Sequence, residues 1–253
     1  MGIADDRDFA APLGLLVGEI RGALDGSLAG LYLYGSLAAG DFDPESSDID
    51  LVAVVHFDVA GEAFDRLDGM HGRFVREHPA WRDRIEVAYV STGVLRNFKE
   101  ETGNIAVVSP GEPFNVKVAD SGWLMNWYMV REAGLTLYGP PPWAFVPEIS
   151  EAEFGDAVRE NTRKWPEWVH GMRHPGARSY VVLTMCRALY TLVNGGQASK
   201  KQAAAWARRY LPAWEPLIRW AWDQRTGALG HSDEEPDFSE IVRFVYHVRD
   251  LVS

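Results

Sequence analysis

The chain has 253 residues, of which 47% are hydrophobic and ten are tryptophans, enough for one large core or two smaller ones. Its formal net charge of −11 argues against a nonspecific nucleic-acid binder, which needs a basic surface to displace counterions from phosphates. A single cysteine excludes an intrachain disulfide, and no apolar run reaches the roughly 18 residues of a transmembrane helix. We therefore expect a cytoplasmic protein without membrane or nucleic-acid partners. Its oligomeric state is not revealed, and a monomer is compatible with the sequence.

The first elements are a helix over residues 7–24 and a short buried strand over residues 31–34, which ends at Gly35 and Ser36. Gly35 would let the backbone approach a phosphate closely. Ser36 can offer its hydroxyl and N–H at the start of a following helix. A Gly-Ser pair alone carries little information, so its meaning depends on the residues that come after it in the chain.

Two aspartates, Asp48 and Asp50, come next, inside an apolar segment that we predict to be a strand. Side chains alternate along a strand, so both carboxylates should point the same way. Such close like charges repel unless a cation lies between them, and hard oxygen ligands suit Mg²⁺. The order of strand, Gly-Ser, spacer and Asp-x-Asp therefore predicts a site for metal and phosphate. The alternative, an edge strand with its polar face in water, does not explain the Gly-Ser pair.

A third carboxylate, Glu86, lies in another alternating segment. Ile85, Val87 and Tyr89 would share one face of a strand, with Glu86 on the other. Helical spacing over residues 61–78 predicts a strand–helix–strand path that returns Glu86 beside the two aspartates. An exposed edge position is the alternative interpretation of an isolated glutamate in a strand.

The remaining chain changes character near residue 149. Residues 97–115, rich in Gly, Glu and Pro, are predicted to form a loop near the site, and helical spacing returns over residues 123–135. The run Tyr-Gly-Pro-Pro-Pro at 138–142 marks a boundary, after which only helices are expected, at about residues 150–170, 179–193, 199–210, 213–225 and 238–252. We predict an α+β protein, with a mixed sheet and helices in a catalytic domain at 1–148 and an all-α helical bundle at 149–253.

The Gly-Ser and Asp-x-Asp motifs resemble those of the nucleotidyltransferase superfamily with the DNA polymerase β-like fold. Several further stretches are similar to streptomycin/spectinomycin adenylyltransferases: residues 31–36, 47–51, 86–87, 137–140, 183–187, 194–196, 199–207 and 210–212. This resemblance implies that AMP is transferred from ATP to a hydroxyl of a small molecule, an aminoglycoside in that family, with antibiotic resistance as the consequence. It also implies that two Mg²⁺ ions and ATP lie in a cleft closed by the helical domain.

The resemblance assigns roles to individual residues. Asp48, Asp50 and Glu86 would hold metal, and Glu86 would be the base; whether it is base, ligand or both stays open. The residues assigned to the nucleotide are Gly35, Ser36, Ser47, Arg187 and Lys200.

The last two assignments also have a physical reason. A charge such as Arg187 on an apolar helix needs an anionic partner, and the first turn of a helix, where Lys200 lies, favours anions. A core Arg–Glu pair and a solvated lysine are the alternatives.

We expect Trp168, Arg173 and Arg178 to contact the acceptor. Trp168 matches an aromatic residue of the streptomycin site, although its helical spacing with Trp165 also fits a core. Arg173 and Ala177 stand where the drug-modifying family has acids, so a cationic drug would meet positive charge; two like charges 4 Å apart cost about 4 kcal/mol at an effective dielectric near 20. Two alternatives therefore remain, a nucleotidyltransferase with a non-aminoglycoside acceptor and a nucleotide-binding regulatory or antitoxin-like protein without turnover.

Overall fold

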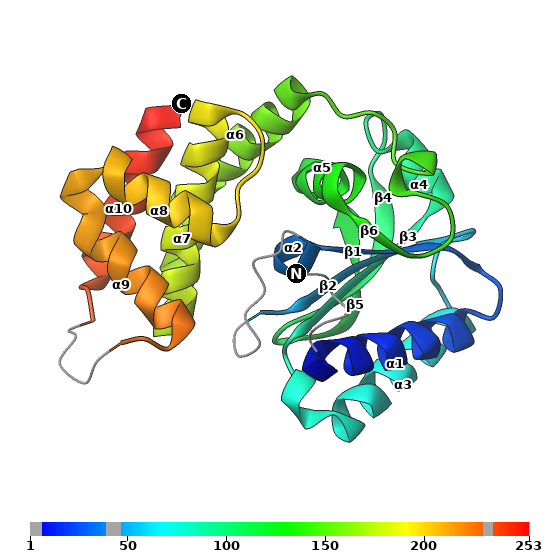
Figure 1. Ribbon diagram of the computed structural model, residues 1–253. Helices are drawn as coiled ribbons and strands as arrows, with labels where there is room; N and C mark the ends of the chain where they lie inside the picture. Colours follow the sequence, from blue (N-terminus) through cyan, green and yellow to red (C-terminus); the bar gives the residue numbers. More distant parts are fainter. Residues whose placement is uncertain (1–6, 39–46, 230–234, 253) are drawn as a thin grey trace. The chain divides into compact units, whose positions relative to one another are not determined.

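The computed structural model describes residues 7–38, 47–229 and 235–252 of the chain. It divides into two compact units, Met1–Glu148 and Ile149–Ser253. The first combines a sheet with helices and the second is helical (Figure 1). The predicted α+β class is confirmed.

Among the described residues of the first unit, six strands form one mixed sheet in the order β5-β4-β3-β2-β1-β6. Strands β2 and β3 are parallel and all other neighbours are antiparallel. A parallel pair needs a crossover connection, which helix α3 (Glu62–Glu77) provides. The strands are β1 (Leu28–Tyr34), β2 (Ile49–Val55), β3 (Ile85–Ser91), β4 (Gly103–Ser109), β5 (Glu112–Ala119) and β6 (Leu135–Tyr138).

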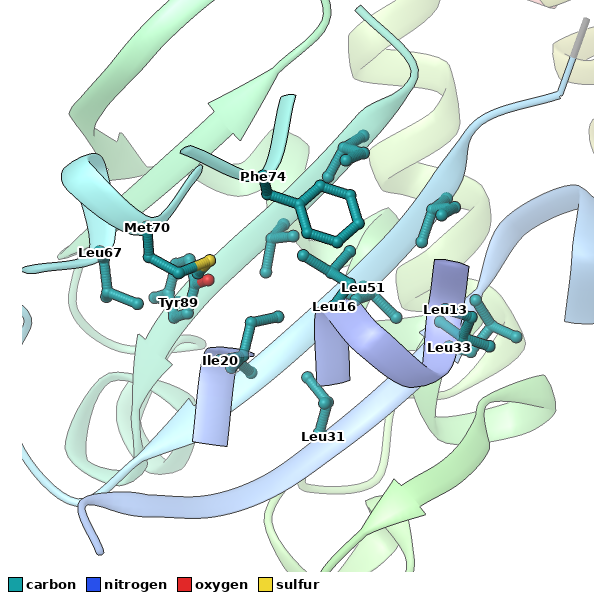
Figure 2. Close-up of a cluster of buried hydrophobic side chains, with 14 of the residues drawn as sticks. Leu13, Leu16, Ile20, Leu31, Leu33, Leu51, Leu67, Met70, Phe74 and Tyr89 are labelled. Atoms are coloured by element: carbon teal, nitrogen blue, oxygen red, sulfur yellow. The ribbon is translucent and has the colours of Figure 1, made fainter. Parts of the chain in front are cut away.

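The two faces of the sheet are covered differently. Helices α1 (Arg7–Leu24) and α3 lie on one face, and α5 (Leu124–Ala133) lies on the other (Figure 1). Figure 2 shows the core on the α1 and α3 face, where Leu16 and Phe74 of these helices meet Leu31, Leu51 and Tyr89 of the strands. Every second residue of β1, β2 and β3 points into this face, and these residues are apolar and buried. We call it the closed face of the sheet. Two short helices, α2 (Gly35–Ala38) and α4 (Thr92–Asn97), complete the unit.

Three sequence predictions need correction here. Strand β2 begins at Ile49, so Asp48 precedes the strand instead of lying inside it. The predicted loop at 97–115 is wrong, because β4 and β5 form an antiparallel hairpin there. The turn between the two strands contains Gly111, which has a φ of +77°. The predicted helix at 123–135 ends at Ala133, and the next residues form β6 because they pair with β1, far away in sequence.

The second unit consists of five α-helices within its described residues. Its first helix begins with a complete capping box between Ser150 and Glu153. The core contains the single cysteine, Cys186, which is fully buried. No helix in the described parts of the chain is both long and apolar enough to cross a membrane. The helices are α6 (Glu151–Trp168), α7 (Pro175–Asn194), α8 (Lys200–Tyr210), α9 (Glu215–Thr226) and α10 (Phe238–Val252).

Candidate active site

Three polar residues form a row across the adjacent strands β1, β2 and β3. Tyr34 pairs with Asp50, and Asp50 pairs with Glu86, so the three side chains leave the same face of the sheet. This is the face opposite the apolar core, since Leu51 and Val87, the next residues along each strand, are completely buried in that core. Asp50 and Glu86 are both partly exposed. Two carboxylates therefore lie side by side on neighbouring strands, about 4.8 Å apart at the backbone.

The Gly-Ser turn lies directly against one of these carboxylates. Gly35 has a φ of +72°, a conformation that side chains other than glycine rarely adopt. A Cβ atom added there would lie 2.0 Å from Oδ2 of Asp50, so no side chain fits. Gly35 and Ser36 open the four-residue helix α2 and are both partly exposed. The space beside Asp50 therefore requires a glycine at the end of β1.

Tyr34 is a member of the site that the sequence reasoning missed. Its hydroxyl donates a hydrogen bond of 3.0 Å to Oε1 of Glu86. The residue is only 3% exposed. The sequence did contain a signal for Tyr34. Side chains alternate along β1, so Tyr34 points to the face of the sheet that Leu33 does not occupy, and it immediately precedes Gly35. What the sequence could not show is that its phenol reaches a glutamate two strands away.

The segment before β2 is fixed by an arginine that sequence reasoning also missed. Arg84 donates two hydrogen bonds to the carbonyl of Ser47, from Nε at 3.1 Å and from Nη2 at 2.6 Å. The backbone N–H of Ile49 donates to the carbonyl of Arg84 at 2.9 Å. Ser47 is buried, with 1% exposure, and Asp48 between these contacts is partly exposed. Arg84 thus ties the start of β2 to the start of β3.

The donor set suits a hard cation. Asp50 and Glu86 offer carboxylate oxygens from adjacent positions, and Mg²⁺ is usually held by one or two carboxylates with water and substrate phosphates completing its octahedron. Within the described residues no group of three His, Cys, Asp or Glu side chains is close enough to hold a metal. The carboxylate pair therefore fits a magnesium ion that shares its coordination with a substrate, and does not form a closed structural metal site.

The helical unit contains the two cations that the sequence assigned to phosphates. Arg187 lies in the middle of α7, partly exposed, between the buried residues Cys186 and Ala188. Lys200 is the first residue of α8, immediately after the capping residue Ser199. A helix N-terminus favours anions, so a cation at this position gains most when an anion is bound nearby.

An aromatic ring beside Lys200 belongs to a series of ring contacts that ends at the predicted acceptor residue Trp168. The Lys200 ammonium lies 5.0 Å from the centre of the Tyr180 ring. Tyr180 also contacts Trp165, and Trp165 packs edge-on against Trp168 with ring centres 5.6 Å apart. Trp168 is the last residue of α6 and is 43% exposed. The buried Trp165 is the core residue of this group, and Trp168 presents a surface to solvent.

The other two predicted acceptor residues meet at one ring. The guanidinium carbon of Arg173 lies 4.2 Å from the centre of Phe238, and that of Arg178 lies 5.4 Å from it. Arg173 donates from Nε to the carbonyl of His170 at 2.8 Å, and Arg178 forms an ion pair of 2.5 Å with Glu235. The charge of Arg178 is therefore balanced, and Arg173 is the exposed cation of this cluster.

Two family models match the chain. The nucleotidyltransferase domain matches residues 18–102, which include Gly35, Asp50 and Glu86. The aminoglycoside adenylyltransferase C-terminal domain matches residues 144–250.

Curated relatives match along nearly the whole chain. An aminoglycoside (3'') (9) adenylyltransferase of Shigella flexneri is 27% identical, covering 96% of this chain and 94% of the relative. One of Klebsiella pneumoniae, also 27% identical, covers 92% and 91%.

A solved structure extends the likeness to the fold. The spectinomycin adenyltransferase of Enterococcus faecialis, crystallised with ATP and spectinomycin, has a TM-score of 0.76 over 96% of this chain and 98% of its own. At 15% identity this comparison speaks for the fold alone. The family models and the curated relatives together show that the chain contains a region similar to a nucleotidyltransferase domain, followed by a region similar to the C-terminal domain of aminoglycoside adenylyltransferases.

Proposed function

We propose that the chain is an adenylyltransferase that moves AMP from ATP to a hydroxyl of a small molecule, with an aminoglycoside as the first candidate acceptor. The observation that carries this proposal is the row formed by Asp50 and Glu86 beside Gly35, within the part that matches the nucleotidyltransferase model. The names of the curated relatives support the adenylyl donor and the aminoglycoside acceptor.

The reaction is an in-line displacement at the α-phosphorus of ATP. The acceptor oxygen forms a bond to this phosphorus as the bond to the bridging oxygen breaks and pyrophosphate leaves. The hydroxyl proton passes to the carboxylate of Glu86. This carboxylate lies on the face of β3 opposite the apolar core, which we call the open face. Tyr34 donates a hydrogen bond to Oε1 of Glu86 and so holds the carboxylate that would receive this proton.

The metal and phosphate ligands are proposed to come from Asp50 and Glu86 of this row and from residues next to Asp50 and Tyr34 in the sequence. Asp48, Asp50 and Glu86 would hold two Mg²⁺ ions, which when bound neutralise the triphosphate and the leaving pyrophosphate and lower the pKa of the acceptor hydroxyl. Gly35 permits close approach of a phosphate to the backbone, and Ser36 offers a hydroxyl beside it.

Three further residues are assigned to the nucleotide. Ser47 is proposed to act at the phosphates through the backbone segment that Arg84 fixes, since Ser47 itself is buried. Arg187 and Lys200 of the helical unit are proposed as the cations for the triphosphate. Lys200 suits this role because it stands at the start of α8, where a bound anion is favoured.

The second candidate is the same transfer to an acceptor that is not a polycation. Arg173 favours it, because its guanidinium is exposed and held on Phe238 while Arg178 is paired with Glu235. A cationic drug placed 4 Å from Arg173 would lose about 4 kcal/mol at an effective dielectric near 20. Trp168 offers an exposed ring to either type of acceptor.

The test is pyrophosphate release from ATP and Mg²⁺ with a panel of acceptors. The panel contains streptomycin, spectinomycin, other aminoglycosides, and neutral and acidic hydroxyl compounds. Release with an aminoglycoside supports the first candidate, and release only with neutral or acidic compounds supports the second. ATP binding by calorimetry without release for any acceptor would contradict both and favour a protein without turnover.

A further inference from the structure

We propose that Tyr34 is a positioning residue, which holds the Glu86 carboxylate in place beside Asp50 before any substrate binds. The inference rests on the proposed transfer reaction and deepens it, because it adds a residue that acts through Glu86. It starts from the 3.0 Å hydrogen bond between the Tyr34 hydroxyl and Oε1 of Glu86.

The geometry of the sheet makes this contact specific. Tyr34 and Glu86 stand on β1 and β3, two strand spacings or about 10 Å apart at the backbone, with Asp50 between them on β2. The phenol must therefore lean across β2 at the level of Asp50 to reach the glutamate. A glutamate with three rotatable side-chain bonds is thereby tied at one oxygen to a ring that is itself well buried, since Tyr34 is 3% exposed.

Gly35 restrains the neighbouring carboxylate in a complementary way. Oδ2 of Asp50 lies within 2.0 Å of the position that a Cβ of residue 35 would take, so this carboxylate is turned toward the end of β1. Two consecutive residues, Tyr34 and Gly35, therefore fix the two carboxylates by different means. Tyr34 holds Glu86 by a hydrogen bond, and Gly35 leaves room for Asp50 because it has no side chain. Orienting partners of this kind usually change metal affinity or activity by about 10- to 100-fold when removed.

Strand β1 also supplies a matched control. Tyr32 lies two residues before Tyr34, on the same face, is fully buried, and donates a hydrogen bond of 2.7 Å to the carbonyl of Pro140. Removing its hydroxyl deletes a comparable buried hydrogen bond on the same strand without touching either carboxylate. Tyr34→Phe and Tyr32→Phe should therefore lower the melting temperature by similar amounts, while differing at the site.

The experiment compares both variants with the wild type in two assays. Steady-state kinetics give kcat and the KM for ATP, and calorimetry gives the affinity for Mn²⁺ in the presence of a non-hydrolysable ATP analogue. Tyr34→Phe is expected to lower kcat and Mn²⁺ affinity about 10-fold, with a smaller change in the KM for ATP. Tyr32→Phe is expected to keep the wild-type values in both assays.

Equal behaviour of the two variants in both assays would overturn the proposal, as would an absence of Mn²⁺ binding by the wild type. If the wild type transfers AMP and only the Tyr34 effect is missing, the proposed function stands and the positioning role falls. If the wild type transfers AMP to no acceptor, the proposed function falls, and the Mn²⁺ affinities alone decide the role of Tyr34.

Discussion

Strand β3 contributes one residue to a polar pair on each of its faces, and the two pairs differ in their surroundings. On the open face Glu86, partly exposed, accepts from Tyr34. On the closed face the Tyr89 hydroxyl lies 2.7 Å from Nε2 of His71, and both side chains are enclosed by α3 and the apolar core. Figure 2 shows Tyr89 among the leucines of that core.

The difference in burial separates a structural pair from the pair for which we propose a chemical role. Burial lowers the pKa of His71 to about 4 and raises the pKa of Tyr89 well above its ordinary value, so neither group changes charge near neutral pH. A partly exposed carboxylate beside a second carboxylate can instead receive a cation or a proton from a substrate. We therefore propose that the titratable groups of this strand serve stability on the closed face and chemistry on the open face.

The largest expected effect is on the open face. Asp50→Asn should abolish transfer, because it removes charge from the centre of the row at which metal and phosphate are proposed to bind. Pyrophosphate release measured at saturating ATP checks this. Asp68→Asn, which changes an exposed aspartate of α3 on the other side of the sheet, is the matched control and should keep the wild-type rate.

A smaller loss is expected when the glycine beside Asp50 is replaced. Gly35→Ala puts a Cβ 2.0 Å from Oδ2 and so displaces the carboxylate. Misplacement of a catalytic group by about 1 Å can cost on the order of 10²-fold in rate. Gly26→Ala imposes a similar positive φ of +80° with nothing within 4 Å, so it isolates backbone strain. Equal rates for the two variants would show that the approach of Gly35 to Asp50 has no role in the reaction.

The closed face predicts a pH effect on stability instead of rate. The pKa of His71 is about 4 when folded and about 6.5 when unfolded, so between these values the unfolded chain binds the extra proton. The contribution of the neutral His71 side chain to the free energy of unfolding is complete above pH 6.5. It is lost as the pH falls toward 4, by about 3 kcal/mol in total. Urea unfolding across this range measures it. His71→Gln should have a flatter pH dependence, and an unchanged slope would exclude His71 as the source.

Local patterns were sufficient where the structure depends on nearby residues. Helices α1 and α10 have the predicted bounds, and the alternation that set Glu86 apart from Ile85 and Val87 is observed. The edge strand β6 was missed because it forms by pairing with β1, which is distant in sequence. The hairpin of β4 and β5 was missed for another reason: its Gly and Pro residues, which form a tight turn between neighbouring strands, were interpreted as a loop.

The same limit applies to the candidate site. The adjacency of Asp50 and Glu86 results from a strand–helix–strand path and was predicted. The contacts of Tyr34 with Glu86 and of Arg84 with the Ser47 carbonyl join residues that share no local motif. Only the assembled sheet brings these partners together.

The most direct test of the account is a comparison of kcat for Glu86→Gln and Tyr89→Phe, which alter the two faces of the same strand. Glu86→Gln should lower kcat by at least about 10²-fold, the usual cost of losing a positioned base. Tyr89→Phe should keep the wild-type kcat and lose about 1 kcal/mol of stability with its hydrogen bond to His71. Near-normal turnover in Glu86→Gln would contradict the assignment of the chemistry to the open face.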